Sequence, residues 1–487
     1  MLRSTKSFII LLAFLAVYSL AACNDDDIYQ APEAVDTYVL AVGDNYGDAV
    51  AGWDVTDISN GTYDLEFYTK SSQTAKLPYL TASGKMTAIK PSEKTWVKNV
   101  IRGVQVSDGT CHIKLNNGEG IEIRSLQLVS SSQKEFNLVK GGDISLLSYV
   151  EDNGGKYYNT DGQSDDCLEI LKQNGMNLVR LRLYNDPGNK DFYPSNTLPA
   201  GYQDEADILR LAKRAKEKGM QIQLTLHYSD SWTNGKDQYK PHEWEMLDYS
   251  GLKDAIYTYT ADILKKMAAQ GTLPEYVSLG NEIQAGFLYP DGACATAAQM
   301  CALLNAGSKA VREVAPESRI VIHSACNEKA TAETGLRWFF GVMRDYSVDY
   351  DVMGISLYPF YTNMWASEFR VMCDRLIDSF DKDILIMETA YAWNPTLPDG
   401  FPGQISHNGP YAEFSKLGQR DFITDLSNQI KQVKNGRVLG YIYWDPIFIA
   451  VPGLGYILGE KNYVSNTTLF GFQGESLPVL DAIKYNN

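Results

Sequence analysis

Two glutamates that are far apart in the chain each end an apolar stretch. Glu282 follows residues 276–281, and Glu388 follows residues 384–387. A carboxylate at the end of a buried stretch is costly unless it has a partner or a chemical role. Two such carboxyls that flank one glycosidic bond can cleave it, because one protonates the leaving oxygen while the other attacks the anomeric carbon. Taken singly, each glutamate is explained as well by an ion pair, but the two together indicate catalysis.

The elements that would position this pair follow a regular alternation. Apolar stretches predict eight strands, at residues 139–144, 178–184, 221–227, 276–281, 320–324, 353–358, 384–389 and 439–444. Amphipathic periodicity predicts helices between them, at residues 204–218, 251–269, 297–314, 337–346, 368–380 and 419–433. Continuous apolar strands indicate burial on both faces and hence a parallel sheet. Eight such units predict a (β/α)8 barrel, of α/β class. An open doubly wound sheet is the alternative, but no Gly-x-Gly-x-x-Gly motif follows the first strand.

Polar or aromatic residues stand at the carboxyl ends of all eight predicted strands, where barrel enzymes place their sites. These residues are Asp143, Arg182, His227, Asn281 with Glu282, His323, Tyr358, Glu388 and Trp444. Packing gives no reason for polar residues at the ends of so many apolar strands. We therefore predict that they line one site, with no metal bound among them.

Several segments resemble glycoside hydrolase family 53, the endo-β-1,4-galactanases. They are residues 141–145, 179–187, 227–232 (His-Tyr-Ser-Asp-Ser-Trp), 280–286 (Gly-Asn-Glu-Ile-Gln-Ala-Gly), 356–360, 387–389 and 443–446, in the order of the family. The resemblance covers about residues 136–487. It implies retaining endo-hydrolysis of β-1,4-galactan or type I arabinogalactan, with release of galacto-oligosaccharides and no cofactor for the chemistry. It also implies that Glu282 is the acid/base and Glu388 the nucleophile.

The other predicted residues are assigned to substrate binding. Asn281 is expected to hydrogen-bond the sugar 2-OH, and Arg182 and Tyr358 to hold Glu388 ionised. Asp143, His227 and His323 are expected to line the cleft, although a histidine at a strand end can also be a satisfied core residue. Trp232 and Trp444 are expected to stack on galactose, because indole presents a flat apolar face.

The loop at residues 393–408 bears on metal binding. Bacterial members of the family often have a calcium loop, rich in Asp, Asn and His, after the seventh strand. Here the loop has some oxygen ligands but no dense acidic cluster. A structural calcium ion therefore stays an open alternative.

Two other functions remain to be weighed. Another β-glycanase of the same superfamily, such as a mannanase, would share the two glutamates, but the segments at residues 227–230 and 356–360 favour a galactanase. A non-catalytic glycan-binding lipoprotein would suit the composition, but it predicts loss of at least one catalytic carboxylate.

The N-terminus is typical of a bacterial lipoprotein. Residues 1–22 carry Arg3 and Lys6, a short apolar run and small residues, as a signal peptide does. The sequence Leu-Ala-Ala-Cys at residues 20–23 resembles the lipobox, which implies that Cys23 is lipidated. The acidic linker at residues 23–37 begins with Asn-Asp-Asp-Asp, which resembles the surface-export signal of Bacteroidetes lipoproteins. We therefore expect membrane attachment through the lipid, at the outer face of the outer membrane.

Residues 38–133 predict a separate β-sandwich. Short alternating strands occur at residues 63–68, 111–115 and 121–126, and Asn116-Asn117-Gly118 predicts a hairpin between the last two. The domain would be either a glycan-binding module, with Trp53 and Trp96 as platforms, or a spacer. The barrel would then occupy residues 134–487.

Charge and cysteine content exclude some partners. The net charge is −16 and the pI about 4.9, which argues against nucleic acid as a ligand. No obligate protein partner is inferred. Apart from Cys23, the six cysteines show no metal spacing, and we expect mostly free, buried thiols.

Overall fold

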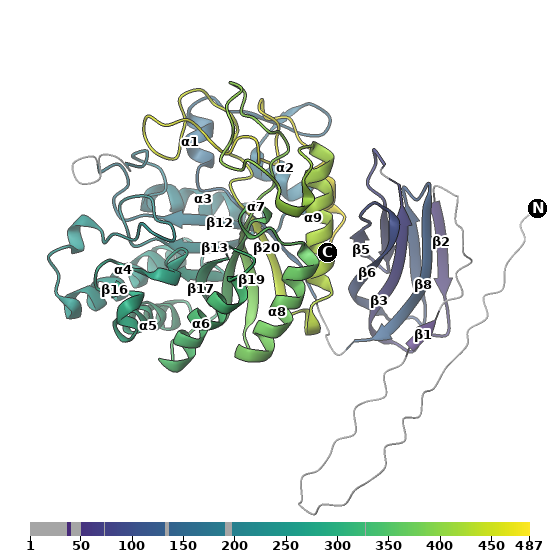
Figure 1. Cartoon of the computed structure of the whole chain (residues 1–487), viewed down its shortest axis with the longest axis horizontal. Helices are drawn as coiled ribbons and strands as arrows, with labels where there is room; N and C mark the ends of the chain where they lie inside the picture. Colours follow the sequence, from purple (N-terminus) through teal and green to yellow (C-terminus); the bar gives the residue numbers. More distant parts are fainter. Residues whose placement is uncertain (1–36, 40–49, 73, 132–135, 190–196, 327) are drawn as a thin grey trace, which may run out of the picture. The chain divides into compact units, whose positions relative to one another are not determined.

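The computed structural model describes residues 37–39, 50–72, 74–131, 136–189, 197–326 and 328–487 (Figure 1). The chain divides into two compact units, one that contains the residues up to Asn137 together with Tyr485–Asn487, and one that spans Leu138–Lys484. The signal peptide, Cys23 and most of the acidic linker lie outside the described residues. Within the described part of the chain, no helix has the length and apolar character needed to cross a membrane.

The first unit is a β-sandwich of two four-stranded sheets. One sheet has the order β1 (Thr37–Val39), β8 (Ile121–Ser130), β3 (Gly61–Ser71), β6 (Ser92–Val106), and the other β2 (Val50–Val55), β7 (Cys111–Asn116), β4 (Tyr79–Ala82), β5 (Lys85–Ala88). Strand β3 alternates strictly, so that Tyr63, Leu65 and Phe67 are buried while the residues between them are partly exposed. The side chains from both sheets form one core. The predicted β-rich region is thus confirmed.

The predicted hairpin between β7 and β8 is wrong. The turn itself forms, with Asn117 in the left-handed region at φ 53° and the Ile121 amide bonded to the Gly118 carbonyl at 3.1 Å. However, β7 pairs with β2 and β4, whereas β8 pairs with β1 and β3. The turn therefore carries the chain from one sheet to the other.

The two tryptophans proposed as platforms in this unit have other contacts. Trp53 is partly buried and packs against the core of the sandwich. The guanidinium of Arg124 lies 4.2 Å from the Trp96 ring centroid, and the Lys70 ammonium lies 5.3 Å from it. Trp96 thus makes cation–π contacts with two basic side chains and is still partly exposed.

The second unit contains a closed barrel of eight parallel strands, which confirms the predicted fold. The strands, in barrel order, are β9 (Val139–Asp143), β12 (Leu178–Leu183), β13 (Gln221–Leu226), β14 (Tyr276–Leu279), β17 (Arg319–Cys326), β18 (Val352–Leu357), β19 (Asp383–Thr389) and β20 (Val438–Tyr443). Every predicted strand is present within a few residues. Small side chains let the strands close, since a Cβ on Gly141 would approach both Leu178 and Ile442 within 3 Å.

Helices surround the barrel strands (Figure 1). The main ones are α3 (Glu205–Glu217), α4 (Tyr249–Ala269), α5 (Ala297–Val314), α6 (Ala332–Asp345), α8 (Ala366–Phe380) and α9 (Lys416–Lys431); shorter ones are α1 (Leu147–Asp152), α2 (Cys167–Gln173), α7 (Pro359–Thr362) and α10 (Val479–Lys484). Asp204 begins α3 by accepting a bond from the Asp207 amide, and Asp248 and Ser415 cap α4 and α9 likewise. Helix α6 begins five residues earlier than predicted, because its first turn is polar and lacks the apolar spacing.

The barrel interior is apolar at one end and polar at the other. Val139, Leu178, Tyr276, Val321, Val352, Leu385, Met387 and Ile442 form an apolar cluster to which seven of the strands contribute. Side chains alternate along a strand, so that Leu178, Arg180 and Arg182 share the inner face of β12. The polar residues therefore lie above the cluster, toward the carboxyl ends of the strands.

Strand β19 contains an irregularity that bears on the site. Ile355 of β18 is opposite Ile386, but Ser356 is opposite Glu388, so that Met387 is an extra residue in β19. Met387 belongs to the interior cluster, and Glu388 also reaches interior partners. In a regular strand two consecutive side chains point to opposite faces. The β-bulge lets Met387 and Glu388 both point inward.

Backbone geometry is unusual just after three of the strands. Tyr228, Glu282 and Asp445 have φ values of 50°, 51° and 41°, which residues other than glycine rarely adopt. Gly280 has a φ of 82°, and a Cβ there would lie 2.6 Å from the side chain of Ile283. The Gly-Asn-Glu segment thus turns sharply at the end of β14 and directs Glu282 over the barrel.

Candidate active site

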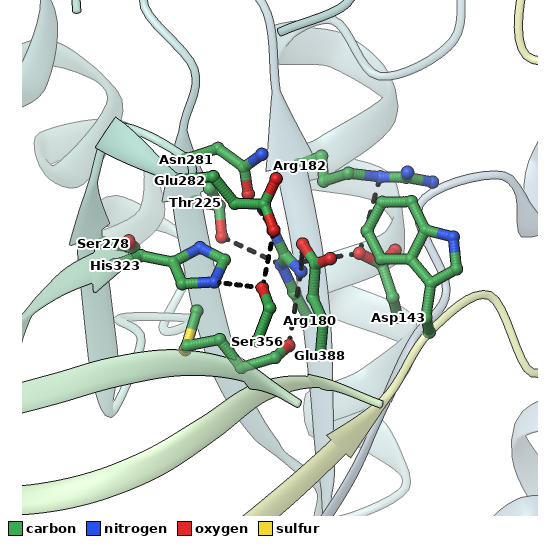
Figure 2. Close-up of polar contacts among 12 residues, drawn as sticks. Asp143, Arg180, Arg182, Thr225, Ser278, Asn281, Glu282, His323, Ser356 and Glu388 are labelled. Atoms are coloured by element: carbon green, nitrogen blue, oxygen red, sulfur yellow. Dashed lines mark hydrogen bonds and ion pairs between the residues drawn. The ribbon is translucent and has the colours of Figure 1, made fainter. Parts of the chain in front are cut away.

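The carboxyl groups of Glu282 and Glu388 face each other at the carboxyl end of the barrel (Figure 2). An oxygen of Glu282, an oxygen of Glu388 and a ring nitrogen of His323 all lie within 4.8 Å of one another. Glu282 is partly buried, and Glu388 is 5% exposed. In glycosidases that retain the anomeric configuration the two carboxyls are about 5–5.5 Å apart, against roughly 6.5–9.5 Å in inverting enzymes. The spacing here fits the retaining arrangement.

Arg180 connects Glu388 to its neighbours. Its Nη1 donates to Glu388 Oε1 at 2.6 Å and to the Met387 carbonyl at 3.3 Å, and its Nη2 donates to Asn281 Oδ1 at 2.7 Å. The side chain is fully buried, and such charge-assisted bonds set both position and charge. The carbonyl of the bulge residue is therefore bonded, and Glu388 is bonded directly to a permanent cation.

Tyr358 contributes the second contact of Glu388. Its hydroxyl donates to Glu388 Oε2 at 2.9 Å. Burial, and next the charges of Glu388 and Glu282, raise the pKa of Tyr358 well above its usual value. Tyr358 is therefore a neutral donor, and it makes the contact with Glu388 that the sequence predicted for it. The prediction that Arg182 also holds Glu388 is wrong, since that contact comes from Arg180, one inward position earlier on the same strand.

Glu282 has the electrostatic environment of an acid. Burial, and next the charge of Glu388, raise the pKa of Glu282 to about 8, while hydrogen bonds from Ser356 and the Gly235 amide and the charge of Arg180 act in the opposite direction. Below about pH 8 Glu282 is therefore protonated. General acid catalysis needs a carboxyl that is protonated at the working pH, and Glu282 meets this need.

Asp143 and Arg182 lie behind the site instead of lining it, which corrects their predicted contact with substrate. Both are fully buried. Asp143 lies between two guanidinium groups, at 3.5 Å from Arg180 Nε and 3.4 Å from Arg182 Nε, and Arg182 Nη2 lies 2.8 Å from Asp445 Oδ1. These buried charges compensate one another, and Asp143 also contacts Arg180 directly.

The two predicted histidines are buried and neutral. Burial, with smaller effects from the nearby arginines, lowers the pKa of His227 and of His323 well below the usual value. His227 stacks on Tyr184 and its Nδ1 lies 2.6 Å from Thr233 Oγ1. His323 lies in the middle of β17, which is longer than predicted, and reaches Glu282 only through Ser356.

Aromatic side chains form one wall of the site. The rings of Trp232 and Trp444 meet edge to face with centroids 6.1 Å apart, and Tyr456 lies 4.7 Å from Trp232 and accepts a bond from Trp444 Nε1 at 3.0 Å. Arg182 lies under Trp444 at 4.5 Å from its centroid. Trp232 is partly exposed and Trp444 is 9% exposed. Arg180, which bonds to Glu388, lies 5.4 Å from the Trp444 centroid, so this aromatic group is close to the carboxyl pair.

In the loop after β19, side-chain oxygen atoms form ion pairs and hydrogen bonds with other groups of the protein. Asp399 pairs with Lys461 at 2.7 Å, and Asn408 bonds to the backbone of Ala392 in both directions and to the Glu413 carbonyl. The six cysteines of the described residues are free, and all but Cys294 are buried.

Four site residues were missing from the prediction. Arg180 could have been predicted from the sequence, because strand alternation places it on the same face as Arg182. Ser356 and Asp445 lie within segments that matched the family but received no role. Tyr456 had no signal, since it comes from a long loop after β20 whose folding no periodicity indicates.

Comparisons with known proteins agree with this geometry. The model of glycosyl hydrolase family 53 matches residues 139–483. An arabinogalactan endo-β-1,4-galactanase A of Aspergillus niger is 31% identical over 348 residues, which cover 68% of this chain and 91% of the fungal one. An endo-β-1,4-galactanase of Bacillus subtilis is 29% identical over 393 residues, 73% of this chain and 87% of the other. Among solved structures, the GH53 catalytic domain of Ignisphaera aggregans is 36% identical with a TM-score of 0.67, and the match covers 72% of this chain and 96% of that domain.

Proposed function

Since the chain belongs to glycosyl hydrolase family 53, we propose that it cleaves β-1,4-galactosidic bonds within galactan or type I arabinogalactan and retains the anomeric configuration. The observation that carries this proposal is the carboxyl pair. Glu282 and Glu388 lie within 4.8 Å at their nearest atoms and differ in environment, one protonated to about pH 8 and one bonded to a buried arginine. The chemistry needs no cofactor.

The reaction proceeds in two steps that these residues explain. Glu388 attacks the anomeric carbon while Glu282 gives its proton to the leaving O4, so that a galactosyl ester forms on Glu388. Glu282, now ionised, takes a proton from water, and that water displaces Glu388 from the anomeric carbon. Two inversions at one carbon leave its configuration as it was. In this proposal Asn281, which accepts a bond from Arg180, hydrogen-bonds the 2-OH of the reacting sugar.

The substrate is tested by comparing polysaccharides. We expect the protein to release reducing ends and short oligosaccharides from linear β-1,4-galactan, and far less from β-1,4-mannan or xylan. An endo-acting enzyme lowers the viscosity of the polymer early, and proton NMR of the first products would show the β-anomer. Cleavage of mannan in place of galactan would keep the mechanism and change the substrate. Binding to a glycan without any cleavage would favour the glycan-binding alternative.

We infer that the protein is a lipoprotein of the cell surface, anchored through Cys23. The Leu-Ala-Ala-Cys sequence at residues 20–23 and the acidic residues that follow support this inference. In a Gram-negative host fed with labelled palmitate, the wild type should incorporate label and Cys23→Ala should not. Protease added to intact cells should degrade the anchored wild type, and label retained by Cys23→Ala would contradict the inference.

A further inference from the structure

A chain of hydrogen bonds from β17 and β18 ends on Glu282. His323 Nε2 lies 2.8 Å from Ser356 Oγ, and Ser356 Oγ donates to Glu282 Oε1 at 2.7 Å (Figure 2). His323 is fully buried and Ser356 is 2% exposed. The two-step reaction described above uses neither side chain, although both lie next to the group that transfers the proton.

The partners of His323 decide which of its nitrogens carries the proton. The ring is neutral, because burial lowers its pKa, and it therefore carries one proton. Nδ1 is buried and has no hydrogen-bond partner among the described residues, whereas Nε2 faces Ser356. A buried N–H without an acceptor is rarer and more costly than a bare acceptor atom. The proton is therefore on Nε2, and His323 donates to Ser356.

This tautomer sets the direction of the serine hydroxyl. Ser356 Oγ has one proton and already receives the N–H of His323, so its own proton points to Glu282 Oε1. Oε1 is then an acceptor at every stage of the reaction. When Glu282 is protonated, its proton must be on Oε2.

We propose that His323 and Ser356 are positioning residues that keep Glu282 Oε1 as an acceptor and so hold the transferable proton on Oε2. This proposal rests on the proposed function, because a defined proton position matters only if Glu282 protonates a leaving oxygen. In the second step the same serine bond stabilises the ionised form of Glu282, while Oε2 accepts the proton of water. No proton passes through Ser356 itself.

The β-bulge of β19 supports this arrangement. The extra residue, Met387, shifts the register so that Ser356 is opposite Glu388. The serine hydroxyl thereby stands between the strand that carries the nucleophile and the loop that carries Glu282. In a regular ladder Ser356 would be opposite Met387 instead of Glu388.

The direction in which the Ser356 bond shifts the pKa of Glu282 follows from the groups that face Glu282. Glu388 disfavours the ionised form, Arg180 and the Gly235 amide favour it, and Tyr358 and His323 are neutral. Ser356 donates to the ionised form and so lowers the pKa of Glu282. Removal of the hydroxyl should therefore raise the pKa of Glu282 above about 8.

The experiment measures this pKa directly. Protein labelled with carbon-13 at the glutamate carboxyls is titrated by NMR, and the Glu282 signal is assigned by its loss in Glu282→Gln. We expect Ser356→Ala to raise the pKa by roughly half a unit to one unit, as loss of one hydrogen bond implies. His323→Leu should raise it too, because the serine proton is then free to turn away. Ser356→Thr and His323→Gln, which keep the donors, should stay close to wild type.

Kinetic measurements with galactan as the substrate give a second test of the roles of His323 and Ser356. The alkaline limb of the kcat/KM profile should move to higher pH in Ser356→Ala and His323→Leu, and kcat should fall about tenfold, the effect of about one hydrogen bond. An unchanged titration, with activity lost equally at all pH values, would show that the pair only supports the fold. A shift in Ser356→Ala without one in His323→Leu would overturn the role of the histidine. The titration needs no substrate, so failure to cleave galactan would count against the proposed function alone.

Discussion

Glu388→Gln should slow the release of reducing sugar from galactan by at least about a thousandfold. The amide keeps the size of the side chain and can still bond to Tyr358, but it cannot form the ester on which the first step depends. Initial rates over a range of galactan concentrations would measure kcat/KM. The loss should appear in kcat, because Glu388 acts on the reacting carbon.

The control for this substitution is Glu217→Gln, an exposed carboxylate at the end of α3 that should keep full activity. A galactoside that carries fluorine at C2 and a good leaving group should trap the ester in the wild type. Mass spectrometry should then find the sugar on the peptide that contains Glu388. Label on another carboxyl, or a variant with near-normal rates, would place the nucleophile elsewhere.

Arg180→Met should lower both stability and activity. The guanidinium bonds to Glu388, Asn281, Thr225 and the Met387 carbonyl, and its loss leaves buried acceptors and a buried carboxylate unpaired. Such a loss costs about 3–5 kcal/mol of unfolding free energy, which urea denaturation would measure. We expect kcat/KM to fall at least about a hundredfold, because the nucleophile and Asn281 both lose the group that positions them.

Arg182→Met is the matched control, since this arginine has the same strand, face and burial but bonds to Asp445 and not to Glu388. It should destabilise the barrel by a comparable amount. Measured at a temperature where both variants are folded, its loss of activity should be much smaller. Equal losses of activity would mean that Arg180 acts through the fold alone.

The sequence predicted the barrel well because its signals are local. Each strand is a continuous apolar run, and each long helix repeats its apolar face, so neither depends on distant parts of the chain. The rule that barrel sites gather at strand ends then brought the two glutamates, Tyr358 and Trp444 together.

The predictions failed for features that depend on contacts between residues far apart in the chain. Turn residues at 116–118 specify a local bend and not the partner strand, so the hairpin prediction failed. The strand-end rule selects the last inward residue of β12, which is Arg182, whereas the contact with Glu388 comes from the inward residue one layer deeper. Tyr456 depends on how the long segment between β20 and α10 folds over Trp444, which no periodicity encodes.

The bulge at Met387 makes the nucleophile sensitive to chain length as well as to residue type. Deletion of one residue from β19 would restore an unbroken ladder and rotate either Glu388 or the apolar residues before it to the outer surface. No replacement of a side chain could reverse that rotation. In the evolution of this barrel, β19 should therefore tolerate exchange of its apolar residues far more readily than an insertion or a deletion, and a compensating change would have to be another change in length.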